Sequence, residues 1–220
     1  MFRIIFIFIA VFIILSCNNG KRYHDKEHHK EKEASLEVVD STNYIALIGF
    51  ERVQLDKEFK TPETSPLSDK RRQNFDQLNY YSIDSVYRVK AYLELTPNEK
   101  PFLMTTTTDR KSKEVKFGIL HFELLEKKLQ LNVYKSLELS KKDGYQDYLF
   151  LPFTDNTNGE ETYGGGRYLD LKIPKGDSII IDFNKAYNPY CAYNKKYSCP
   201  IVPSENHLDL EIKAGVKVFK

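Results

Sequence analysis

The chain has 220 residues and carries 33 Lys and Arg against 31 Asp and Glu, so its formal charge is close to zero. That balance argues against the clustered basic face of a nucleic-acid-binding protein, so we expect no nucleic-acid partner. The length fits one domain with an N-terminal extension, and 15 Tyr and 14 Phe without any Trp must supply much of its core.

The N-terminus is typical of an exported lipoprotein. Arg3 supplies positive charge, and the apolar run from Ile4 to Leu15 is too short to span a bilayer comfortably as a helix. The run closes on Ser16-Cys17, and the sequence around it resembles a lipobox, the motif for lipoprotein maturation. This predicts a signal peptide over residues 1–16 and a lipid on Cys17 that makes the membrane a partner. The alternative is an uncut membrane anchor with an incidental Cys.

Residue 18 bears on where such a lipoprotein resides. An Asp directly after the lipidated Cys typically retains a lipoprotein at the Gram-negative inner membrane, whereas here Asn18 follows. We therefore expect a membrane-anchored lipoprotein of the cell envelope, with the outer membrane favoured over the inner membrane. Residues 17–43 are expected to be the lipidated Cys and a charged, flexible tether, because this stretch has few apolar residues to bury. His24, His28 and His29 in the tether are able to bind metal, but a solvated spacer is the commoner outcome.

A single β-rich domain is expected over residues 44–220, and it begins with a helix. Side chains at three- and four-residue spacing share one helical face. These are Ile45, Ile48, Arg52, Leu55 and Phe59. The helix must end by Thr61, because Pro62 disfavours helical backbone in the residue before it. A second short helix is expected after Ser68.

From Tyr87 onward the apolar residues recur with period two, which is typical of strands with one buried and one wet face. Alternation predicts strands over residues 87–95, 128–139, 169–173 and 208–213. Further strands are expected over residues 102–107, 115–125, 148–153 and 178–183. Glu126-Lys127 is expected to be a tight hairpin turn. Half-buried sheets are usually antiparallel, and closing or stacking a sheet removes exposed edges. We therefore predict a mainly β fold, an antiparallel barrel or sandwich of about eight strands with one or two N-terminal helices.

Two polar stretches in the last third interrupt the alternation. The first, residues 151–168, holds three consecutive glycines but lacks the GxGxxG and GK[ST] patterns of phosphate-binding loops. The second runs from residue 182 to residue 207 and is rich in Asn, Tyr and Pro. A binding pocket combines apolar walls with a few convergent polar groups. The candidate ligand-binding residues are Asp155, Tyr163, Arg167, Asp182, Asn184, Tyr187, Asn188, Tyr190, Glu205 and Asn206. The alternative is a stapled, turn-rich loop in which Asn and Asp bond their own backbone.

Cysteine usage points to a bonded pair. Lipidation of Cys17 leaves Cys191 and Cys199, which seven residues separate. In an oxidising envelope such a pair is most simply a disulfide. Free thiols and a metal site are the alternatives, and the nearest histidine to the pair is His207. We predict no metal site and no cofactor.

Catalytic motifs are absent, since the chain contains neither G-x-S-x-G nor H-E-x-x-H. The preferred hypothesis is a binding module for a small ligand or an envelope partner. One alternative is a hydrolase-like enzyme that uses Asp155, Asp182 or Glu205 as acid or base. Another is a structural or interaction lipoprotein in which the polar stretches only fasten loops.

Several segments together resemble a known family. They are residues 149–155, 161–169, 182–194, Cys199-Pro200 and Glu205-Asn206. Earlier matches are Arg52, Asp56 and Phe59, residues 65–67 and residues 75–81. From about Ile45 to Val218 the chain is similar to the family catalogued as domain of unknown function 1684. The resemblance implies the extent of the domain and assigns no activity. The chain departs from the family pattern at Asp109, where a glycine is usual, and at Val216, where an acidic residue is usual.

Overall fold

The computed structural model describes residues 41–220. The predicted signal peptide, the lipidation site at Cys17 and nearly all of the tether lie outside the described residues. Within residues 41–220, no helix combines the length and the apolar character needed to cross a bilayer.

The described chain begins with the expected helix, α1 (Ser41–Lys60), followed by the short α2 (Asp69–Gln73). Lys57 and Lys60 lie in the last turn of α1, where positive charge complements the helix dipole. Ile48 and Phe59 are buried against the domain as predicted. Ile45 was expected on the same face, but it is 51% exposed, and Tyr44 instead fills the buried position beside it.

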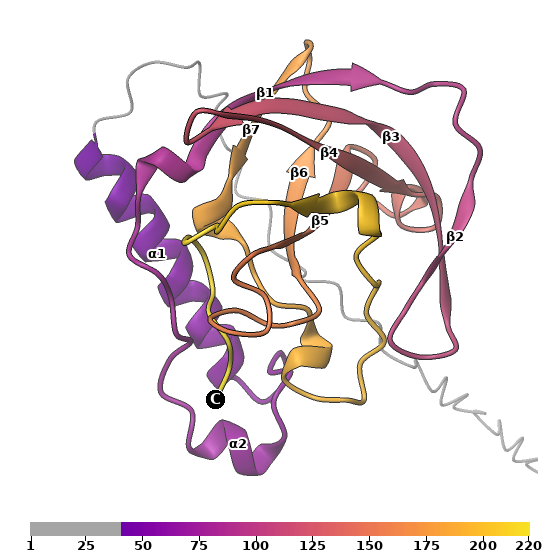
Figure 1. The fold of residues 1–220 in the computed structure, drawn as a ribbon. Helices are drawn as coiled ribbons and strands as arrows, with labels where there is room; N and C mark the ends of the chain where they lie inside the picture. Colours follow the sequence, from indigo (N-terminus) through magenta and orange to yellow (C-terminus); the bar gives the residue numbers. More distant parts are fainter. Residues whose placement is uncertain (1–40) are drawn as a thin grey trace, which may run out of the picture. The chain divides into compact units, whose positions relative to one another are not determined.

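One eight-stranded sheet forms the body of the domain. Its strands are β1 (Arg88–Leu95), β2 (Phe102–Thr105), β3 (Lys111–Leu124), β4 (Lys127–Ser136), β5 (Tyr148–Asp155), β6 (Arg167–Lys172), β7 (Ser178–Asp182) and β8 (His207–Leu208). The order is β6-β5-β4-β3-β1-β7, with β2 added to β3 and β8 to β5. All pairings are antiparallel except that of β8 with β5. The sheet curls into a half-barrel, with α1 alongside it (Figure 1). The prediction of a mainly β fold of about eight strands is confirmed.

The inner face of the curled sheet carries the main core. Strand alternation places one apolar side chain from each of several strands there with no solvent exposure, including Ala91, Leu120, Leu131, Leu149 and Ile181. Burial of each leucine or isoleucine side chain among them contributes about 1.5–3 kcal/mol. A second, smaller core joins α1 to the chain's last residues through Phe59, Leu78, Tyr193 and Val216.

The β3–β4 hairpin turns one residue earlier than predicted. The turn residues are Leu125 and Glu126, and both have positive φ, at 49° and 62°. Two successive left-handed residues define a type I′ turn, whose twist matches that of paired strands. Neither residue is the usual Asn or Gly, so the sequence carried no local marker for the position of the turn.

Candidate functional site

Arg167 and Asp155 form a closed, fully buried ion pair. Both side chains have 0% exposure, and Arg167 Nη2 lies 2.8 Å from Asp155 Oδ2. The guanidinium also donates to the backbone oxygens of Ile212 and Ala214. The other carboxylate oxygen accepts from the backbone N–H and the hydroxyl of Thr157, at 2.9 and 2.6 Å. These contacts fasten the β5–β6 connection to the C-terminal segment, which favours a structural role for the pair.

Asp182 and Asn184 belong to a different network, at the end of β7. The hydroxyl of Tyr44 on α1 donates to Asp182 at 2.9 Å, and Asn184 Nδ2 donates to that hydroxyl at 2.9 Å. Asn184 also bonds both the N–H and the C=O of Asp84. Burial and the neighbouring Asp182 carboxylate raise the pKa of Tyr44 well above its usual value. The network ties α1 to the sheet.

The remaining candidate amides and Glu205 also bond the protein itself. Asn206 Nδ2 donates to Pro152 O at 2.7 Å and to Asn132 O at 2.8 Å, which pins the segment before β8 to the sheet. Asn188 Nδ2 donates to Lys217 O at 2.9 Å. Glu205 accepts a long contact of 3.5 Å from the Tyr134 hydroxyl.

The candidate tyrosines line no single space with these groups. Tyr187 donates to Asp170 at 2.6 Å, and Tyr190 packs its ring 5.2 Å from that of Tyr197. Tyr163 instead faces Cys191, with 3.9 Å between its hydroxyl and the sulfur. The structure therefore divides the candidate residues among several separate groups of contacts, and it does not gather them around one pocket. Ligand binding by them stays a prediction, and the hydrolase alternative gains no support from two carboxylates held in different networks.

Cys191 and Cys199 are free thiols that lie in contact. The backbone N–H of Cys191 donates to Cys199 Sγ at 3.2 Å. Hydrogen bonds from Cys199, Tyr163 and Thr107 lower the pKa of Cys191 to about 7, although burial opposes this shift. The predicted disulfide between Cys191 and Cys199 stays a prediction. Within residues 41–220, no group of three or more His, Cys, Asp and Glu side chains is arranged to hold a metal ion.

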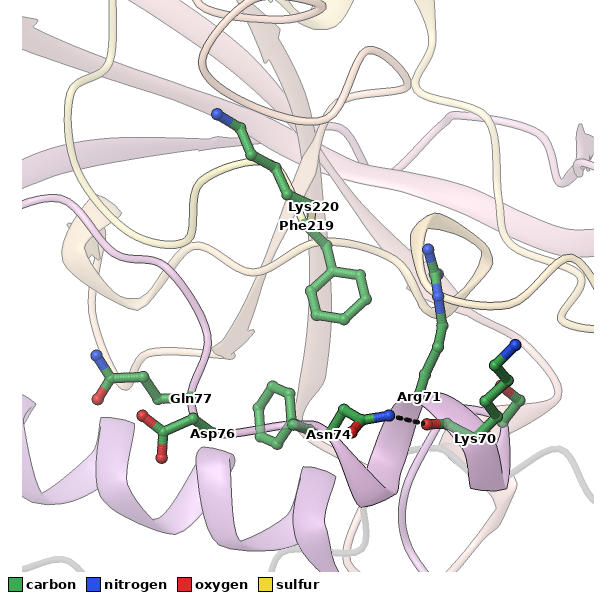
Figure 2. A pocket seen from close by; sticks show the side chains of 9 residues that line it. Lys70, Arg71, Asn74, Asp76, Gln77, Phe219 and Lys220 are labelled. Carbon is green, nitrogen blue, oxygen red and sulfur yellow. Dashed lines mark hydrogen bonds between the residues drawn. The ribbon is translucent and has the colours of Figure 1, made fainter.

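A pocket that the sequence analysis did not anticipate lies between α2 and the C-terminal residues. Its volume is about 580 Å³. It is lined by Ser68, Lys70, Arg71, Asn74, Phe75, Asp76, Gln77, Phe219 and Lys220. Figure 2 shows the Phe219 ring in the middle of the view, between Arg71 on one side and Asp76 and Gln77 on the other. The residues come from two ends of the domain about 140 positions apart, so no local motif marked them.

Arg71 is held in this pocket by a ring contact and a hydrogen bond. Its guanidinium carbon lies 5.1 Å from the centre of the Phe219 ring, a cation–π distance. Its Nη1 donates to Tyr193 O at 3.1 Å, while Nε and Nη2 make no hydrogen bond within residues 41–220. Lys70 and Lys220 add positive charge, and the one carboxylate of the lining, Asp76, lies 3.6 Å from Lys60. The side chains of the lining therefore carry a positive excess.

The described chain is a β domain with a single curled sheet, and α1 packs alongside it. The family model described as a protein of unknown function, DUF1684, matches residues 73–217, so the chain belongs to that family. Among solved structures, it is similar to an uncharacterized protein of Haloarcula marismortui determined by solution NMR. The two are 31% identical with a TM-score of 0.62, over 81% of this chain and 96% of that one. No curated protein matches the chain.

Proposed function

We propose that this chain is a lipid-anchored envelope protein whose β domain binds a small anionic ligand with a planar apolar part. The observation that carries the proposal is the pocket between α2 and the C-terminal residues. There the Arg71 guanidinium lies over the Phe219 ring, and its Nε and Nη2 make no hydrogen bond to any residue from 41 to 220. A guanidinium with free N–H groups binds phosphate or carboxylate oxygens in a fork. The rings of Phe75 and Phe219 supply the apolar wall.

The anchor in this proposal rests on the lipobox-like sequence at Cys17 and on the outer face of α1. Leu47, Phe50 and Val53 lie on that face, with exposures of 47%, 61% and 62%. The helix starts 24 residues after Cys17, so a lipid on Cys17 would keep it close to a bilayer. An exposed apolar helix face with lysines at its end suits the interfacial region of a membrane. We therefore take the lipid surface as the partner of α1.

Ligand binding is tested with phenyl phosphate, which combines a dianion with a flat ring. We expect its addition to shift the NMR signals of Phe75, Phe219 and Arg71 in a saturable way. Lys70→Ala and Arg71→Gln should each weaken the apparent affinity about five- to tenfold, because each removes one positive charge from the pocket. Lys128→Ala on β4 is the matched control and should leave the affinity unchanged, since this exposed lysine lies outside the pocket. The binding proposal would be refuted if only signals of residues outside the pocket shift, or if the pocket variants bind phenyl phosphate as tightly as the parent.

The anchor is tested separately in cells of a Gram-negative host. The full chain should sediment with membranes and yield a mature N-terminus at Cys17 with an acyl-sized mass increase, whereas Cys17→Ser should remain unprocessed and carry no acyl group. Inner and outer membranes separated on a density gradient then test the outer-membrane expectation. An unmodified Cys17 in the full chain would remove the lipoprotein part of the proposal and leave the pocket untouched.

A further inference from the structure

Cys191 and Cys199 lie on two differently supported segments. Cys191 is in the short 3-10 helix η4 (Tyr190–Ala192), and Cys199 lies beside the end of β2. The segment of Cys199 is held by backbone hydrogen bonds, from Thr107 N to Cys199 O at 2.8 Å and from Ile201 N to Thr105 O at 2.8 Å. The side chain of Thr107 also accepts from Cys199 N at 3.1 Å. The segment of Cys199 is therefore fixed to the end of β2, and Cys191 reaches it from the short helix η4.

The two thiols differ in access to solvent. Cys199 is buried, with 7% of its surface exposed, whereas Cys191 is half-buried. Tyr163 and Thr107 surround the Cys191 sulfur with hydroxyl donors, and Cys199 adds its S–H. Ionisation of Cys191 next to it, together with burial, raises the pKa of Cys199. Cys191, the more accessible thiol, is thus the one that ionises first, and a thiolate is the form that attacks a disulfide.

We propose that Cys191 and Cys199 are a reversible thiol–disulfide exchange site, with Cys191 as the attacking thiol and Cys199 as the resolving thiol. The co-reactant is an external disulfide of a small thiol or of another protein. The Cys191 thiolate attacks one sulfur of that disulfide, the S–S bond breaks, and one thiolate leaves. Cys199 then gives up its proton to the solvent and attacks Cys191 Sγ, which releases the second external thiolate.

The electron balance of this sequence is complete. The external disulfide gains two electrons and becomes two thiols, while the two cysteines lose two electrons and form one bond. An external dithiol reduces the disulfide and restores the two thiols. This reduction is favoured because the hydrogen-bond donors around Cys191 stabilise its thiolate, and so the reduced form. This site is independent of the anionic-ligand pocket, and neither proposal depends on the other.

The test uses the full, folded chain and oxidised glutathione as the probe. Trypsin cuts after Lys195 and Lys196, so Cys191 and Cys199 fall on separate peptides, and Cys17 falls on a third. We expect glutathione redox buffers to interconvert the free and the linked peptide pair, and dithiothreitol to reduce the linked pair without denaturant. Iodoacetamide should alkylate Cys191 at least about tenfold faster than Cys199 at pH 6, with a midpoint near pH 7 for Cys191.

Single-serine variants separate the two roles. Cys199→Ser should accumulate a glutathione mixed disulfide at Cys191, because no resolving thiol remains, whereas Cys191→Ser should leave Cys199 largely unmodified. Circular dichroism checks that both variants fold. If a variant unfolds, the alkylation rates and the redox titration of the parent chain still test the exchange proposal. A pair that stays reduced in oxidised glutathione, a bond that opens only after denaturation, or faster alkylation of Cys199 would each overturn the proposal.

Discussion

Replacing Arg167 with Met removes the guanidinium from the buried ion pair and retains most of its apolar stem. The variant leaves the Asp155 carboxylate buried without its cation, and it leaves Ile212 O and Ala214 O without their donors. Loss of one partner of a buried pair costs about 3–5 kcal/mol. With a urea m-value of roughly 2 kcal/mol/M, the unfolding midpoint should fall by about 1.5–2.5 M. Urea titration followed by far-UV circular dichroism measures this shift.

Lys172→Met is the matched control, because Lys172 ends the same strand β6 but is exposed. It should change the free energy of unfolding by about 0.5 kcal/mol or less. The double variant Arg167→Met with Asp155→Leu should recover part of the loss, since no unpaired charge then remains. A loss below about 1 kcal/mol for Arg167→Met would refute the structural role of the pair and return Arg167 to the candidate ligand-binding residues.

Three further variants probe backbone strain and buried charge. Gly215→Ala should lower the free energy of unfolding by about 2 kcal/mol or more, because Gly215 has φ +78° and an added Cβ would lie 2.5 Å from Ala186 O. Gly159→Ala, with φ +88° but open space, should cost only about 1 kcal/mol, and differential scanning calorimetry compares the two losses; equal losses would contradict the predicted clash. Glu114 is 3% exposed, and its Oε2 has no hydrogen-bond partner in the part of the chain that the structure describes. Burial raises the pKa of Glu114 in the folded state. The folded protein therefore binds more protons than the unfolded chain, so this residue's contribution falls as pH rises above the unfolded pKa of about 4.3. Glu114→Gln should be more stable than the parent by about 1 kcal/mol at pH 8, with no gain at pH 4, and a gain of equal size at both pH values in urea titrations would rule out this charge effect.

Sequence periodicity determined the architecture of this domain. Alternation identified strands such as β1 and β6, in which exposed residues separate buried or half-buried ones, and the spacing of Ile48 and Phe59 identified α1. It could not identify β5, because five successive residues of that strand are buried. Periodicity did not determine details that depend on which residues pack together in the folded chain. Ile45 fits the helical pattern and is still exposed, and the β3–β4 turn falls at Leu125-Glu126, one residue from its predicted place.

The tertiary structure decided what the polar residues do. The sequence marked Asp155, Arg167, Asp182 and Asn184 as unusual, but several of their partners lie far away in the chain. Tyr44 is 138 positions from Asp182, and Ile212 is 45 positions from Arg167. A side chain that converges on a ligand and one that neutralises a distant backbone carbonyl look identical in sequence, because both are polar groups between strands. Only the folded chain shows that these groups hydrogen-bond one another and backbone groups in the interior. Arg71 and Phe219 instead meet at the surface, where Nε and Nη2 of the guanidinium make no hydrogen bond within residues 41–220.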